Sequence, residues 1–268
     1  MDMETLRARG LVLLGCGRMG GALLRGWLAG GFPPGAVHVI DPDPADWLTG
    51  TGVHLNEPLP DAPGIVLVAV KPQMMTDALP SIRALGGGAT VFLSVAAGTP
   101  IAAFEAALGQ GTPVIRAMPN TPAAIGRGIT ALVANSEGVP SLDLADELMG
   151  AVGQVVRLDD EAQMDAVTAV SGSGPAYVFH LIECLAAAGE AQGLAPDLAL
   201  RLARATVGGA GHLAEDAGES PGDLRRAVTS PNGTTQAALE VLMAEDGLAP
   251  LMRRAVAAAA DRSRELRG

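Results

Sequence analysis

The chain has 268 residues, enough for one large domain or two ordinary ones, and 49% of them are hydrophobic while only 3% are aromatic. Its core must therefore be built mainly from Ala, Val, Leu and Met. The formal net charge of -11 argues against nucleic acid as a partner, because phosphate backbones attract basic surfaces. No stretch of 18 or more uncharged apolar residues predicts a membrane span.

The two cysteines, Cys16 and Cys184, form neither a metal-ligand spacing nor a disulfide framework. A reduced, cytoplasmic setting is the simplest interpretation. The first ten residues, MDMETLRARG, carry acidic residues early and predict no signal peptide, and we expect them to lead directly into a strand. The four histidines are scattered along the chain and predict no metal site.

Up to about residue 160, apolar runs alternate with helical patterns. Residues 11–31 predict a strand, a glycine turn and a helix, and the further runs predict strands within 37–44, 64–72, 90–98, 112–119, 129–135 and 154–159. Helical patterns fall within 74–85, 101–108 and 141–153. This alternation predicts an α/β Rossmann-type doubly wound domain, with a mostly parallel sheet covered by helices on both faces.

Beyond residue 160 the strands stop, and residues 174–194, 196–218, 233–245 and 247–268 predict helices. We therefore expect a dinucleotide-binding domain over residues 1–160 and an all-α domain over residues 161–268. The helices are rich in Ala and Gly and carry more apolar surface than a small bundle can hide. They predict burial against another subunit.

The segment GCGRMG follows the first strand and opens the first helix. Its glycines have distinct roles in dinucleotide binding: Gly15 makes the turn, Gly17 lets the backbone approach a pyrophosphate, and Gly20 permits close helix packing. Arg18 and Met19 begin the helix, whose free N–H groups attract phosphate. The alternative is a glycine turn that only lets strand and helix pack together.

Asp41 ends the second predicted strand, 21 residues after Gly20, where an acidic residue takes the adenosine ribose hydroxyls. The following residues, PDPADWL, hold no Arg or Lys to neutralise a 2′-phosphate, which favours NAD over NADP. An ordinary turn aspartate explains Asp41 equally well.

Lys71 is the only lysine of the chain and follows the third predicted strand, at the sheet edge where doubly wound folds bind ligands. It predicts a contact to a cofactor ribose or phosphate, with a chance surface lysine as the alternative.

Asn120, in the proline-punctuated segment RAMPNTP, predicts an amide near the nicotinamide end, although an ordinary turn is as good an explanation. For SGSGPA, at residues 171–176, a hinge or helix start is the better explanation.

The stretch TSPNGTTQAAL, at residues 229–239, gathers hydroxyls and an Asn-Gly pair before an apolar run. It could cap a helix or hold a ligand. Capping requires one side chain, so it explains one hydroxyl and leaves the others available.

Six segments together closely resemble the pyrroline-5-carboxylate reductase family, and they cover nearly the whole chain in the right order. They are GCGRMGGALL, VAVKPQ, SVAAGTP, RAMPNTPAAIGRG, DAVTAVSGSGPAYVF and VTSPNGTTQAALEVL. The resemblance implies an N-terminal Rossmann domain and a helical dimerisation domain, with dimers that often assemble into decamers. It also implies hydride transfer from NADH or NADPH to the C=N bond of 1-pyrroline-5-carboxylate, giving proline.

The resemblance also implies roles for individual residues. The hydroxyl-rich loop would hold the substrate carboxylate, with Thr235 beside the ring nitrogen as the catalytic residue that relays its proton. Glu161 matches a substrate-contacting acid of some members, although a surface glutamate is the better interpretation from sequence alone. The implied substrate residues are Ser230, Asn232, Gly233, Thr234, Thr235 and Glu161. The implied cofactor residues are Gly15, Gly17, Arg18, Met19, Gly20, Asp41, Val70, Lys71, Pro72, Ala96, Ala97 and Asn120.

Two departures from the family pattern fall in or beside the loop. Asn232 stands where the family commonly has glycine, and because Asn tolerates positive φ, the turn can survive. Its amide either crowds the carboxylate site or adds a donor. Ala227 stands where many members have Asn or Gln, so any contact from that side chain is lost.

Two other functions remain to be weighed. A β-hydroxyacid dehydrogenase would share a Rossmann start and a helical second domain, but it relies on a catalytic lysine, and no lysine follows Lys71. A non-catalytic nucleotide-binding protein would not need the hydroxyl-rich loop. Cofactor preference stays open, because many family members favour NADPH while Asp41 and its acidic neighbours favour NADH.

Overall fold

The computed structural model describes residues 1–266, and its contacts divide the chain into two units. The first unit comprises Met1–Gly172 together with the C-terminal residues from Ala259, and the second comprises Ser173–Ala258. The predicted boundary between residues 160 and 161 falls at the start of a short 3-10 turn, Glu161–Gln163.

Among its described residues, the first unit contains one sheet of eight strands, in the order β3-β2-β1-β4-β5-β6-β7-β8. The strands are β1 (Leu11–Leu14), β2 (Val37–Ile40), β3 (His54–Leu55), β4 (Ile65–Val68), β5 (Val91–Ser94), β6 (Val114–Met118), β7 (Gly128–Ala134) and β8 (Gly153–Arg157). All neighbouring pairs are parallel except β6 and β7, which are antiparallel. A short connection joins those two strands, too short for the crossover that a parallel pair requires.

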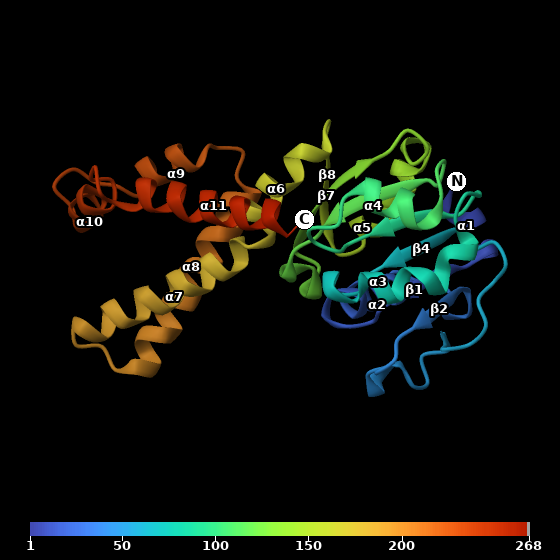
Figure 1. The fold of residues 1–268 in the computed structure, drawn as a ribbon. Helices are drawn as coiled ribbons and strands as arrows, with labels where there is room; N and C mark the ends of the chain where they lie inside the picture. Colours follow the sequence, from blue (N-terminus) through green and yellow to red (C-terminus); the bar gives the residue numbers. More distant parts are fainter. Residues whose placement is uncertain (267–268) are drawn as a thin grey trace. The chain divides into compact units, whose positions relative to one another are not determined.

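Helices cover both faces of this sheet (Figure 1). They are α1 (Met3–Arg9), α2 (Arg18–Ala29), α3 (Met75–Ala78), α4 (Ile101–Leu108), α5 (Leu142–Gly150) and α6 (Met164–Val167). Successive residues of β1 enter different cores: Leu11 and Leu13 lie in the core that contains α2 and α5, and Val12 and Leu14 in the core that contains α3 and α4. Burial on both faces explains why the strands are continuous apolar runs.

The expectation that the first ten residues lead directly into a strand is wrong, because Met3–Arg9 form the helix α1. Asp2 caps this helix by accepting a hydrogen bond from the Thr5 backbone N–H at 2.9 Å. Leu6 is fully buried in the core and holds the helix against the sheet. Local capping together with one long-range apolar contact therefore forms a helix where the sequence shows no clear periodicity.

The helix expected over residues 74–85 is interrupted. The α-helix α3 covers only Met75–Ala78, and a 3-10 helix continues from Leu79 to Leu85. Pro80 lies at the start of the 3-10 segment and has no backbone N–H to donate to the preceding turn. The tighter helix results from this missing donor.

The second unit is helical. Its helices are α7 (Gly174–Ala191), α8 (Pro196–Asp216), α9 (Pro221–Ala227) and α10 (Thr234–Leu242), while α11 (Leu248–Glu265) begins there and its last residues belong to the first unit. The sequence did not predict α9. Few residues of this unit are buried, and its large apolar side chains that face solvent include Phe179, Leu181, Leu185, Leu198, Leu202 and Leu213. Apolar surface of this extent is typical of an interface with another protein chain.

Among residues 1–266, no helix is long and apolar enough to span a lipid bilayer.

The two tryptophans allow a test of the packing between α2 and α5. Trp27 is buried, and its indole N–H donates a 2.8 Å hydrogen bond to the carbonyl of Leu148, near the end of α5 where helix carbonyls lack partners. We expect Trp27→Phe to lower the free energy of unfolding by about 2 kcal/mol, through the lost hydrogen bond and the smaller ring. Urea denaturation measures the effect.

Trp47→Phe is the matched control, because Trp47 is only half-buried and lies under the Arg25 guanidinium. Equal losses in the two variants would contradict this account.

Candidate functional site

The glycine turn after β1 is required by close packing within the protein. Gly15 has φ +90°, and a Cβ there would lie 3.0 Å from Val70 Cγ1. At Gly20 a Cβ would lie 2.2 Å from the carbonyl oxygen of Gly15, which no side chain could tolerate. Gly15 and Gly20 are therefore explained by the turn and by helix packing alone.

Gly17 is different, because a Cβ built on it meets nothing within 4 Å. It is the N-cap of α2, and no side chain makes a capping hydrogen bond there. The first backbone N–H groups of α2, at Arg18 and Met19, thus begin a helix whose end is uncapped and beside open space. Such an end attracts phosphate, so the turn fits the pyrophosphate of a dinucleotide.

Asp41 holds the glycine turn to the end of β2. The residue is only 9% exposed, and its carboxylate accepts hydrogen bonds from the backbone N–H of Cys16 at 2.6 Å and of Asp43 at 2.9 Å. The bond to Asp43 is that of a turn aspartate, and the bond to Cys16 fixes the turn that precedes α2. A carboxylate has about four acceptor positions, so capacity remains for ribose hydroxyls.

Cys16 lies in the middle of this arrangement. Burial raises the pKa of its thiol to about 11, and the neighbouring Asp41 carboxylate adds to the rise. The thiol therefore stays protonated at neutral pH. Cys16 is a small buried side chain, and it is not a nucleophile.

The loops after β4 and β5 lie at the same sheet edge as the glycine turn, because β1, β4 and β5 are neighbouring parallel strands. The first loop carries Val70, Lys71 and Pro72, and the Lys71 side chain is exposed. The second carries Ala96 and Ala97, and the Ala96 N–H donates to Ser94 Oγ at 3.2 Å. The structure therefore brings these predicted cofactor residues to one edge of the sheet.

Asn120 follows β6 at the same edge, but its amide is already in use. The Nδ2 group donates to the carbonyl of Ser171 at 3.2 Å, and Oδ1 accepts from the Ile129 N–H at 3.0 Å. The side chain thereby joins the end of β6 to β7 and to the turn before α7. One amide hydrogen and one lone pair remain for a ligand.

Glu161 is not a surface glutamate, so that interpretation is wrong. Its side chain is 26% exposed and pairs with Arg116 of β6, which is 5% exposed. The same oxygen, Oε1, accepts from the Arg116 guanidinium at 2.5 Å and from the Ile101 N–H at 2.9 Å. A buried guanidinium needs a countercharge, and Glu161 supplies it while capping α4 from 60 residues away. The feature of the sequence that could have indicated this ion pair is Arg116, the single charged residue within the apolar run VIRAM.

The hydroxyl-rich loop precedes α10 in the second unit. Asn232 has φ +60°, which agrees with the expectation that Asn can adopt the turn in place of glycine. Gly233 is the N-cap of α10, and a Cβ there would lie 2.4 Å from Ser230 Oγ. A side chain at this position would require the Ser230 hydroxyl to move.

The expectation that one hydroxyl caps α10 is wrong, because no side chain of the described residues makes a capping bond at Gly233. The Thr229 hydroxyl donates instead to the carbonyl of Arg225, at 2.6 Å. Gln236 was missed: its Oε1 accepts from the Asn232 N–H at 2.8 Å and so fixes the turn. Thr234 is exposed and Thr235 is half-buried at the first turn of the helix.

The loop can therefore bind an anion. An uncapped helix N-terminus presents N–H groups, and the serine and threonine hydroxyls next to it add donors. A carboxylate matches this set of donors. Within residues 1–266 no three His, Cys, Asp or Glu side chains are grouped so that they could hold a metal ion.

Two family models match the chain. The model described as pyrroline-5-carboxylate reductase dimerisation matches residues 161–266, and the model described as NADP oxidoreductase coenzyme F420-dependent matches residues 11–98. The first match begins at Glu161 and includes the hydroxyl-rich loop. The second includes the glycine turn, Asp41 and the loops after β4 and β5.

Individual relatives extend over nearly the whole chain. A pyrroline-5-carboxylate reductase of Pseudomonas aeruginosa is 41% identical, and the alignment covers 96% of each chain. The structure of the Coxiella burnetii pyrroline-5-carboxylate reductase superposes with a TM-score of 0.91 at 33% identity, over 97% of this chain and 99% of that one. The structure of the Plasmodium falciparum pyrroline carboxylate reductase, which has NADP bound, gives 0.85 at 25% identity, over 98% and 100%. The chain belongs to the pyrroline-5-carboxylate reductase family.

Proposed function

We propose that this chain reduces the C=N bond of 1-pyrroline-5-carboxylate to L-proline with a hydride from NADH or NADPH. The observation that carries the proposal is the uncapped start of α10, which presents N–H groups and hydroxyls that the helix itself does not use. A substrate carboxylate would accept hydrogen bonds from these N–H and hydroxyl groups. Identity of 41% to a pyrroline-5-carboxylate reductase over nearly the full chain supports the same conclusion.

The cofactor residues all belong to the first unit. The pyrophosphate would lie on Gly17, Arg18 and Met19 at the start of α2, next to the turn that Gly15 and Gly20 form. Asp41 would take the adenosine ribose, and the loops after β4 and β5, with Asn120, would border the nicotinamide end. These loop residues are Val70, Lys71, Pro72, Ala96 and Ala97. The bound cofactor supplies the hydride.

The substrate residues belong to the second unit, apart from Glu161. Ser230, Asn232, Gly233 and Thr234 would hold the carboxylate through hydroxyl and backbone N–H groups. Thr235 would hydrogen-bond the ring nitrogen and relay its proton. A protonated imine accepts a hydride at carbon without a metal, so the main task of the residues is orientation. Glu161 is proposed as a substrate residue because the family resemblance implies it, and its two hydrogen bonds described above both end on Oε1.

We also propose that the protein is a cytoplasmic homodimer that can assemble further into a decamer. The match of residues 161–266 to a dimerisation family and the exposed apolar side chains of α7 and α8 support the dimer. Burying those side chains against a second copy would offset their exposure to water.

A β-hydroxyacid dehydrogenase is the alternative enzyme, and a non-catalytic nucleotide-binding protein is the alternative of another class. The first requires a catalytic lysine in the helical part, where the sequence has none. The second predicts cofactor binding with no turnover. Adding 1-pyrroline-5-carboxylate with NADH or NADPH, and following the loss of nicotinamide absorbance, separates the proposal from both.

Thr235→Val tests the proposed proton relay, since it removes the hydroxyl while keeping the shape of the side chain. We expect kcat for the imine to fall about 10-fold to 100-fold, the value of one hydrogen bond made in the transition state. Steady-state kinetics at saturating cofactor measure this. Thr229→Val is the matched control, because the Thr229 hydroxyl bonds the Arg225 carbonyl within its own segment. Normal kcat and KM in Thr235→Val would eliminate the relay.

The position of Asp41 leads to a prediction about whether the chain prefers NADH or NADPH. Its carboxylate is buried beside the turn, Asp43 and Asp46 follow it, and residues 42–48 hold no basic side chain to neutralise a 2′-phosphate. We expect kcat/KM to be about 10-fold higher for NADH than for NADPH, because like charges repel. Asp41→Asn should reduce that ratio, whereas Asp61→Asn, on an exposed loop before β4, should not. A wild-type preference for NADPH would show that Asp41 does not select against the phosphate.

A further inference from the structure

The loop between β5 and α4 is held by contacts from distant parts of the chain. It runs from Val95 to Pro100 and carries Ala96 and Ala97 of the proposed cofactor site. Glu161 fixes its far end by accepting the Ile101 N–H. The middle of the loop, at Gly98, lies against the end of α11.

Gly98 and Leu266 are in close contact. A Cβ built on Gly98 would lie 3.3 Å from both the Cβ and the carbonyl oxygen of Leu266. Gly98 also has φ +76°, a conformation that side chains rarely adopt. The loop therefore has glycine where the chain bends and where the last turn of α11 lies against it.

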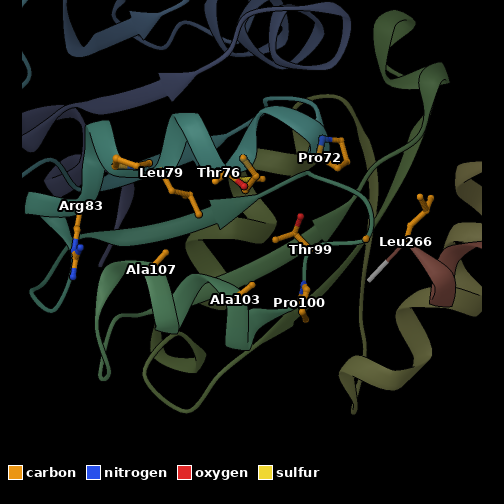
Figure 2. Close-up of a pocket in the computed structure, with 12 residues that line it drawn as sticks. Pro72, Thr76, Leu79, Arg83, Thr99, Pro100, Ala103, Ala107 and Leu266 are labelled. Atoms are coloured by element: carbon orange, nitrogen blue, oxygen red, sulfur yellow. The ribbon is translucent and has the colours of Figure 1, made fainter. Parts of the chain in front are cut away.

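Leu266 contacts more than this one glycine. It forms one wall of a cavity of about 470 Å³, whose other walls include Pro72 after β4 and Thr99 and Pro100 after β5 (Figure 2). Pro72 and the segment from Ala96 onward belong to the two loops that would border the nicotinamide. Leu266 thus lies against the loop after β5 at Gly98 and shares this cavity with Pro72 of the loop after β4.

A buried hydrogen bond holds this end of α11 in place. The Ser263 hydroxyl donates to Asp165 Oδ1 of α6 at 2.8 Å, and both residues are buried. Ala260, one turn earlier, is buried as well. Leu266 itself remains 53% exposed, so hydrophobic burial alone explains little of its position.

We infer that the end of α11 positions the cofactor loop: Ser263 fixes the helix on Asp165, and Leu266 holds Gly98 so that Ala96 and Ala97 are preorganised for the dinucleotide. The inference rests on the proposed function. Ser263 and Leu266 are positioning residues that act through Gly98 and touch neither cofactor nor substrate. Preorganising a binding loop strengthens binding by lowering the cost of ordering it.

The test measures cofactor affinity directly. Dissociation constants for NADH and NADPH are obtained by fluorescence titration of the full chain, without substrate, for the wild type, Ser263→Ala and Leu266→Gly, which removes the Cβ that lies against Gly98. We expect both variants to bind about 3-fold to 10-fold more weakly, the size typical of coupling through packed residues. At saturating cofactor, kcat should stay at the wild-type value, because the bound cofactor then holds the loop in its ordered conformation.

Arg262→Ala is the matched control. Arg262 lies in the same last turn of α11, is exposed, and pairs with Glu265 of its own helix. It should leave the dissociation constants unchanged. Unchanged affinity in Leu266→Gly and Ser263→Ala would overturn the inference. A lower Tm without a change in affinity would overturn it too, because the contact would then only stabilise the fold.

Asp165→Ala removes the acceptor of the same hydrogen bond, in case Ser263→Ala folds poorly. It should weaken cofactor binding in the same direction as Leu266→Gly. Wild-type protein that binds cofactor but does not reduce the imine would refute the proposed function while leaving this comparison of affinities intact.

Discussion

The carboxylate of Asp41 and the backbone N–H of Cys16 form the hydrogen bond on which the geometry of the cofactor edge depends. A buried charge is costly unless donors surround it, and here the N–H groups of Cys16 and Asp43 provide them. The bond joins the end of β2 to the turn after β1. Close packing around Gly15 and Gly20, where no side chain fits, constrains the same turn, from which α2 begins.

Glu161 has a comparable role farther along the same edge. It neutralises Arg116 on β6 and caps α4, so one carboxylate connects a strand and a helix that are far apart in sequence. Two acidic side chains, one buried and one partly buried, thus fix the start of α2 and the start of α4. The second unit has almost no buried polar groups of this kind, and its exposed apolar side chains make it dependent on a partner surface instead.

The sequence predicted seven of the strands because parallel strands buried on both faces are continuous apolar runs. It missed β3, which has two residues, and α9, whose seven residues are too few to show a period. Ser220 followed by Pro221 and Asp223 was the local signal for α9, since Ser220 accepts from the Asp223 N–H.

The candidate site was predictable where backbone conformation is decisive, as at the glycine turn and at Asn232. It was not predictable where a side chain bonds to a residue far along the chain. Nothing local indicates that the Asn120 amide is taken up by Ser171 and Ile129, or that Glu161 meets Arg116. Such pairs arise from the topology of the sheet. The loop at α10 differed because no hydroxyl caps the helix, while Gln236, in its first turn, fixes the preceding turn by accepting from the Asn232 N–H.

Lys71 gives this edge of the sheet an unusual chemical property. It is the single lysine among 268 residues, and its side chain is exposed directly after β4. The chain therefore carries one ε-amino group, so a reagent that acylates amines has one side-chain target. A spectroscopic label on that side chain would report on this edge of the sheet without any engineered residue.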